Sequence, residues 1–141
     1  MSDVLVVSGA GPYADPWHPF AATSARLAKI IEGLGCRVVV RSDVEAALAH
    51  PGSCRLLVVN IGNPSAPRPQ EAIDAVAQGL ATHLEAGGAL LGVHASATSL
   101  TTMAQWPTLL GGRWVRGETM HPPRGDARIE ITDTDHPVSA G

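Results

Sequence analysis

The sequence predicts an α/β domain built on a parallel β-sheet. Two short apolar runs, DVLVVS at 3–8 and RLLVVN at 55–60, are typical of strands that are buried on both faces. Such runs alternate along the chain with segments whose apolar residues repeat at helical spacing, most clearly at 70–86. Because this alternation is typical of right-handed β-α-β crossovers, it predicts a doubly wound sheet.

The individual elements follow from the same patterns. The predicted strands are 3–8, 36–40, 55–60 and 89–93. The predicted helices are 20–34, with Ile30 and Leu34 in its apolar stripe, 44–49 and 70–86. Near the end of the chain, DARIEIT at 126–132 alternates apolar and polar residues, which predicts a half-exposed antiparallel strand.

Length and composition favour one domain and argue against several partners. A chain of 141 residues suits a single domain over 1–141. The net charge of −3 and the aromatic content of 4% do not fit a nucleic-acid-binding surface. The first residues lack a basic signal-peptide region, and no run approaches the ~20 apolar residues that span a membrane. We therefore expect a cytoplasmic protein without a membrane partner.

Polar side chains follow the predicted strands at the end where ligands of open α/β sheets bind. The loops there carry His18, Asn60, His94 and His121. His94 comes directly after a buried strand and has small neighbours, which favours a sharp turn that aims its ring into a crevice. Hydrogen bonding of His94 to a loop backbone is the structural alternative. Imidazole suits both proton transfer near neutral pH and metal ligation.

Other patterns leave alternatives open. A Gly-x-Gly follows the first strand as in dinucleotide-binding loops, but Ala14 stands where a third glycine is needed. Ser96 is a weak candidate for a hydrolase nucleophile because no Ser-His-Asp order surrounds it. Trp106 and Trp114 have ring faces suited to a sugar, and core packing explains them equally well. His83, near a helix end, fits a solvated surface.

Several segments occur in an order typical of one known family. They are VLVVSG at 4–9, WHP at 17–19, RLLVVNIGN at 55–63, LEAGGALLGVHASA at 84–97, WPTLLGGRWVRGETMHPP at 106–123 and IEITDTDHPVSAG at 129–141. Together they resemble the trehalose-utilisation (ThuA-like) family of the class I glutamine-amidotransferase-like superfamily, over essentially the whole chain. The G-V-H-A segment is similar to that family's G-[IV]-H-[AS] motif.

The resemblance implies a flavodoxin-like three-layer sandwich with a mainly parallel sheet, and a role in disaccharide or ketosugar utilisation. It places His18, His94 and His121 at histidine-bearing positions of the family motifs. His94 stands where amidotransferases of the superfamily carry a nucleophilic cysteine, so cysteine-based glutamine hydrolysis is not expected. Trp17 replaces an arginine that usually precedes the first histidine. Family members usually continue past the closing motif, which indicates a domain that lacks its C-terminal part.

The sequence therefore predicts a ThuA-like protein that binds a sugar in a histidine-lined crevice. The candidate catalytic residues are His94, His121 and His18, which are also the candidate ligands of a divalent metal such as zinc. The candidate substrate-binding residues are Asn60, Ser96, Trp106 and Trp114. The alternative is a non-catalytic interaction module on an amidotransferase-like scaffold, which forms a homo-oligomer because an unpaired sheet edge must be covered.

Overall fold

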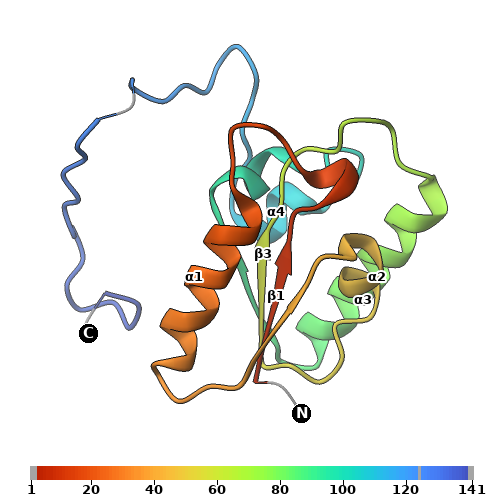
Figure 1. Ribbon diagram of the computed structural model, residues 1–141, viewed down its shortest axis with the longest axis horizontal. Helices are drawn as coiled ribbons and strands as arrows, with labels where there is room; N and C mark the ends of the chain where they lie inside the picture. Colours follow the sequence, from red (N-terminus) through yellow and green to blue (C-terminus); the bar gives the residue numbers. More distant parts are fainter. Residues whose placement is uncertain (1–2, 124, 140–141) are drawn as a thin grey trace.

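Residues 3–123 and 125–139 are described by the computed structural model, which is built around a four-stranded sheet (Figure 1). All four strands are parallel and lie in the order β2-β1-β3-β4. The strands are β1 (Val4–Ser8), β2 (Val38–Arg41), β3 (Leu56–Asn60) and β4 (Ala89–Gly92). The longer helices are α1 (Phe20–Glu32), α2 (Val44–Ala49) and α3 (Gln70–Glu85). The predicted α/β fold is confirmed.

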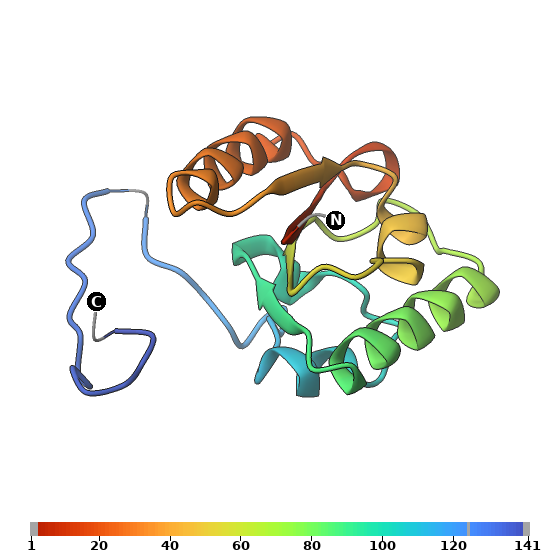
Figure 2. The ribbon, with the colours of Figure 1, turned by 90° about the horizontal axis from the view of Figure 1, so that it is seen from below.

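Helices cover both faces of the sheet, which gives the flavodoxin-like three-layer arrangement (Figure 2). On one face, valines of β1 and β3 pack against Leu27 and Ile31 of α1. On the other face, the alternate strand residues form the larger core with α2 and α3. Members of that core are Leu5, Val7, Ala47, Leu48, Leu57, Val59, Ile73, Val76 and Leu80. Successive side chains of a strand point to opposite faces, so the central strands β1 and β3 contribute to both cores.

Three short helical segments lie near the carboxyl ends of the strands. η1 (Gly11–Tyr13) follows β1, η2 (His94–Thr98) follows β4, and α4 (Trp106–Leu110) packs beside β4. The sequence patterns did not predict α4, although Pro107 in its first turn and the left-handed Gly111 at its end are usual start and stop signals. Neither these helices nor any other in the described ranges is long and apolar enough to cross a membrane.

The prediction of a strand at 126–132 is wrong for the structure described. These residues are exposed and pair with no strand of the sheet. In both ribbon views the blue segment after α4 runs away from the sheet (Figures 1 and 2). Ile129, for example, is 87% exposed. Alternation gives a segment strand-like character, but a lone extended segment lacks the ladder of hydrogen bonds that stabilises a strand.

Two predictions about burial are also wrong. Ile30 and Leu34 are 54% and 78% exposed, because the core on this face of the sheet reaches only Leu27 and Ile31. His83 is buried rather than solvated, and its Nε2 lies 3.0 Å from the carbonyl oxygen of Ala89. Periodicity identified helical stripes correctly but could not show how much of each stripe the sheet covers.

Candidate functional site

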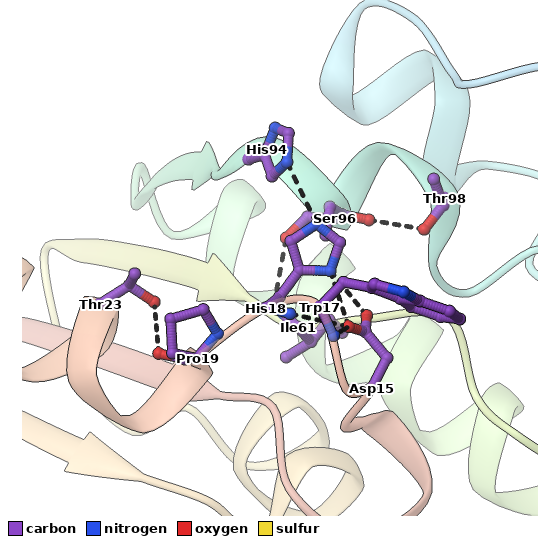
Figure 3. Close-up of polar contacts among 10 residues, drawn as sticks. Asp15, Trp17, His18, Pro19, Thr23, Ile61, His94, Ser96 and Thr98 are labelled. Carbon is purple, nitrogen blue, oxygen red and sulfur yellow. Dashed lines mark hydrogen bonds and ion pairs between the residues drawn. The ribbon is translucent and has the colours of Figure 1, made fainter. Parts of the chain in front are cut away.

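His18 and His94 meet at the carboxyl ends of the strands, although 76 residues separate them in the chain. His18 lies in the loop after β1, and His94 is the first residue of η2. Their Nε2 atoms are 3.2 Å apart and their ring centroids 5.1 Å apart, with 62° between the ring planes (Figure 3). We call these two rings the histidine pair. His94 is exposed and the side chain of His18 is 34% exposed, so a ligand can reach both.

Asp15 fixes the orientation of His18. Its carboxylate oxygens lie 2.8 and 2.7 Å from His18 Nδ1, and Oδ1 also accepts 2.9 Å hydrogen bonds from the backbone N–H groups of Trp17 and His18. Burial raises the pKa of Asp15, but these hydrogen bonds outweigh it and hold the pKa below its ordinary value. The ionised carboxylate accepts the hydrogen of His18 Nδ1. In the neutral tautomer of His18 that this contact favours, the lone pair is on Nε2 and faces His94, and His94 Nε2 carries the hydrogen between the two rings.

His94 has an unusual backbone conformation that aims its ring at His18. Its φ is +43°, in the left-handed region that residues with side chains rarely adopt. The carbonyl of Val59 accepts hydrogen bonds from Val93 N–H at 2.9 Å and from Ser96 Oγ at 2.5 Å, one on each side of His94. Trp106 Nε1 donates to the carbonyl of Ser96 at 2.9 Å, which connects α4 to η2. The sharp turn that the sequence predicted after the fourth strand is therefore present.

We expect His94→Gly to be more stable than His94→Ala by about 1 kcal/mol, because glycine adopts the left-handed conformation without a steric penalty. Chemical denaturation of both variants measures the difference. The matched control is the pair His50→Gly and His50→Ala, since the φ of His50 is −135° and glycine gains nothing there. Equal stability of the two variants at position 94 would show that the backbone there relaxes when the imidazole is removed.

A partly buried ion pair anchors the loop that carries Asp15 and His18. Glu45 of α2 accepts hydrogen bonds from Arg68 Nε at 2.5 Å, from Arg68 Nη2 at 3.0 Å and from the hydroxyl of Tyr13 at 3.0 Å. The hydrogen bonds from Arg68 lower the pKa of Glu45, although burial opposes them. Burial and the hydrogen bond to Glu45 raise the pKa of Tyr13, so its hydroxyl stays a donor. The loop is thus connected to α2 just before Asp15.

Acid should weaken the fold partly through Glu45. Its unfolded pKa is near 4.5 and its folded pKa is lower, so its contribution is present above about pH 4.5 and is lost as the pH falls through the folded pKa. We expect Glu45→Gln to cost about 1 kcal/mol at about pH 6 and to flatten the decline of unfolding free energy towards about pH 3. Urea titrations at both pH values measure this effect. Glu32→Gln at the exposed end of α1 is the control, and an equal decline in both variants would contradict the prediction.

A cavity of about 530 Å³ opens beside His94. His94, Trp114 and Thr119 line it together with residues of β4 and α4. The volume lies within the range of roughly 300–1,000 Å³ that is usual for small-molecule sites. A larger cavity, of about 670 Å³, lies at the opposite end of the strands and is lined by His50 and Cys54 among others. We place the candidate site at His94, since ligands of open α/β sheets bind outside the carboxyl ends of the strands.

Three of the predicted site residues have structural partners instead of open surroundings. Asn60 is 4% exposed, and its Nδ2 donates to hydroxyl groups of α1 at 2.8 and 2.9 Å. Ser96 is fully buried, and Trp106 is 1% exposed. Their hydrogen bonds hold α1 and η2 in place, so these side chains form the support of the site and are not presented to solvent.

The remaining two predicted residues, Trp114 and His121, pack against each other. Trp114 is part of the wall of the cavity beside His94. His121 is exposed, and its ring packs against Trp114 with a centroid distance of 5.8 Å. Within residues 3–123 and 125–139, no group of three or more His, Cys, Asp and Glu side chains is arranged to hold a metal ion. The structure therefore brings together His18 and His94 but does not add His121 to them.

Two residues of the site were missed by the sequence patterns. Asp15 orients His18, and Trp17 is 80% exposed beside it (Figure 3). The Asp-Pro dipeptide at 15–16 was an available signal, because an aspartate in such a position often accepts hydrogen bonds from backbone N–H groups two or three residues further on. No family model, curated protein or solved structure matches this chain. The resemblance to the ThuA-like family stays a prediction.

Proposed function

We propose that this chain is a ThuA-like protein of carbohydrate utilisation that binds a sugar or ketosugar beside the histidine pair. It acts on that sugar by acid–base chemistry and not through a cysteine nucleophile. The observation that carries the proposal is the 3.2 Å approach of His18 Nε2 and His94 Nε2, with Asp15 on the far nitrogen of His18. Side chains from loops after β1 and β4 meet there beside a cavity large enough for a small molecule.

The hydrogen-bond chain from Asp15 to His94 supports proton transfer. With His94 Nε2–H donating to His18 Nε2, the lone pair of neutral His94 is on Nδ1. When Nδ1 takes a proton from a substrate, the Nε2 hydrogen moves to His18, and the carboxylate of Asp15 stabilises the imidazolium that forms there. Removal of a proton from carbon next to a ketone is the reaction that such a base performs on a ketosugar.

Two tryptophans near the pair favour a carbohydrate over other small polar ligands. Trp17 is 80% exposed in the loop that carries His18, and Trp114 lines the cavity beside His94. Flat indole faces suit the C–H surface of a pyranose ring, while the imidazoles interact with its hydroxyl and carbonyl groups. The site thus combines apolar ring faces with groups that donate and accept hydrogen bonds.

The test measures how fast the hydrogen on the carbon next to the carbonyl of a ketose exchanges for deuterium in D2O. Nuclear magnetic resonance monitors this exchange. Fructose and a keto-disaccharide are the probes. We expect exchange with the unchanged protein and at least a tenfold loss in His18→Ala and His94→Asn, since general acid–base catalysis contributes about 100-fold or more. Asparagine is chosen because it tolerates the left-handed backbone at this position.

The control for this experiment is His50→Ala, which removes a histidine at the opposite end of the strands. Thermal unfolding of each variant identifies any loss that comes from the fold. Exchange that is unchanged in both folded site variants, or that is absent in the unchanged protein, would overturn the proposal.

The alternative of a self-associating interaction module is favoured by the open edges of the sheet. β2 and β4 are the outer strands, and Val39, Val40 and Leu91 on them are 44%, 45% and 47% exposed. Exposed apolar side chains on unpaired strands promote pairing between copies. Sedimentation velocity tests this alternative. A tight dimer that Leu91→Lys disrupts, and whose sedimentation does not change when sugar is added, supports the interaction module. A monomer argues against it.

A further inference from the structure

We propose that His18 and His94 together bind one divalent transition-metal ion of the zinc class through their Nε2 atoms. Asp15 acts as the carboxylate behind His18, and two coordination positions remain open to a ligand. Binding of the ion itself does not depend on the proposed function. Only the identity of the ligand at the open positions, vicinal oxygens of a sugar, rests on the sugar binding of that function. With the ion bound, His94 has no free lone pair, so the metal-bound pair binds the sugar and does not act as its base.

The spacing of the two rings fits a shared ion. Zinc binds imidazole nitrogen at about 2.0–2.1 Å in tetrahedral sites, so two such nitrogens lie about 3.3 Å from each other. His18 Nε2 and His94 Nε2 are 3.2 Å apart. The rings are also tilted suitably, since their centroids are 5.1 Å apart. Two imidazoles that share one tetrahedral ion place their centroids about 5.2 Å apart, whereas rings that point straight at each other place them about 5.5 Å apart.

Asp15 supplies the contact that histidine ligands of metals usually have on their other nitrogen. A metal-bound imidazole generally donates its second N–H to a carboxylate or carbonyl, which fixes the ring and the tautomer. His18 Nδ1 lies 2.7 Å from Oδ2 of Asp15, and the same carboxylate is held by two backbone N–H groups (Figure 3). The Nε2 atom of His18 is therefore already directed toward His94 before any ion binds.

The ion would replace the hydrogen that joins the rings. With both rings neutral and no ion bound, His94 Nε2 carries that hydrogen. On binding, neutral His94 takes the tautomer with hydrogen on Nδ1, so both Nε2 lone pairs face the ion and the neutral pair releases no proton. Two nitrogen ligands favour zinc, cobalt or nickel over magnesium and calcium, which prefer oxygen. Two protein ligands leave room for two oxygens of a bound molecule.

The experiment is calorimetric titration of the tag-free chain with ZnCl2, without sugar, and absorption spectroscopy with Co²⁺ as the spectroscopic probe. We expect one bound ion per chain and the visible bands of tetrahedral cobalt. His18→Ala and His94→Asn should each weaken zinc binding at least tenfold. Asp15→Asn keeps an oxygen for the two backbone N–H groups and should weaken it about 10- to 100-fold.

The controls are His50→Ala and His121→Ala, which should bind zinc like the unchanged protein, and MgCl2, which should not bind. Thermal unfolding without metal shows whether each variant is folded. The proposal is overturned if folded His18→Ala and His94→Asn keep full zinc affinity, or if the unchanged protein binds no zinc at millimolar concentration. Because the titration contains no sugar, its failure leaves the sugar-exchange experiment as an independent test, and failure of that experiment leaves the zinc result standing.

Discussion

Trp106→Ala should destabilise the protein by about 3–5 kcal/mol, the usual cost of removing a large buried aromatic side chain. Trp106 is 1% exposed and belongs to the larger core. Its Nε1–H also donates to the carbonyl of Ser96, so the variant leaves that buried acceptor without its donor. Since Ser96 is part of η2, the turn at His94 should lose order as the core is weakened.

The matched variant is Trp106→Phe, which keeps an aromatic ring but cannot donate this hydrogen bond. We expect it to lose clearly less stability than Trp106→Ala. Urea denaturation gives both values, and near-ultraviolet circular dichroism shows whether the core stays ordered. A loss below about 1 kcal/mol for Trp106→Ala would contradict the structural role and restore Trp106 as a candidate for sugar binding.

Gly79→Ala should cost about 2–3 kcal/mol, the upper part of the usual range for overpacking, although alanine is the better helix former by about 1 kcal/mol. Gly79 lies within α3 where that helix crosses α2. A Cβ at this position would be 2.3 Å from the carbonyl oxygen of Leu48 and 2.4 Å from that of Ala49. These are backbone atoms, so the two helices would have to move apart to accept a methyl group.

Gly112→Ala is the control for this substitution, because a Cβ there meets nothing within 4 Å. Its stability should change little. The sign of the change in the free energy of unfolding distinguishes two explanations. Helix propensity alone predicts that Gly79→Ala stabilises the protein, whereas close packing of α2 on α3 predicts that it destabilises it.

The sheet could be predicted because its strands are dominated by valine and leucine with few polar residues. The runs at 3–8 and 55–60 differ from β1 and β3 only at their first residue. The turn at His94 could also be predicted, since a buried strand ends there and small residues follow. These features are local, and each is visible within a few consecutive positions.

The partners within the site could not be predicted in the same way. The Asp-Pro dipeptide indicates that Asp15 accepts hydrogen bonds from nearby backbone N–H groups, but no local pattern indicates that its carboxylate also contacts the ring three residues later. Ser96 and Trp106 resemble loop residues because 95–115 lacks a clear period, yet both are directed inward by hydrogen bonds formed only in the fold. Which side chains face a crevice depends on the packing of η2 and α4, and that packing is not a property of any short segment.

The long interval between His18 and His94, 76 positions along the chain, links ligand binding to unfolding. An unfolded chain rarely brings two such distant rings together, since closing a loop of this length costs several kcal/mol of conformational entropy. A molecule or ion that needs both imidazoles therefore binds the native state almost exclusively. Its presence should raise the melting temperature progressively as its concentration exceeds the dissociation constant, which makes a thermal-shift screen a direct way to find what this crevice binds.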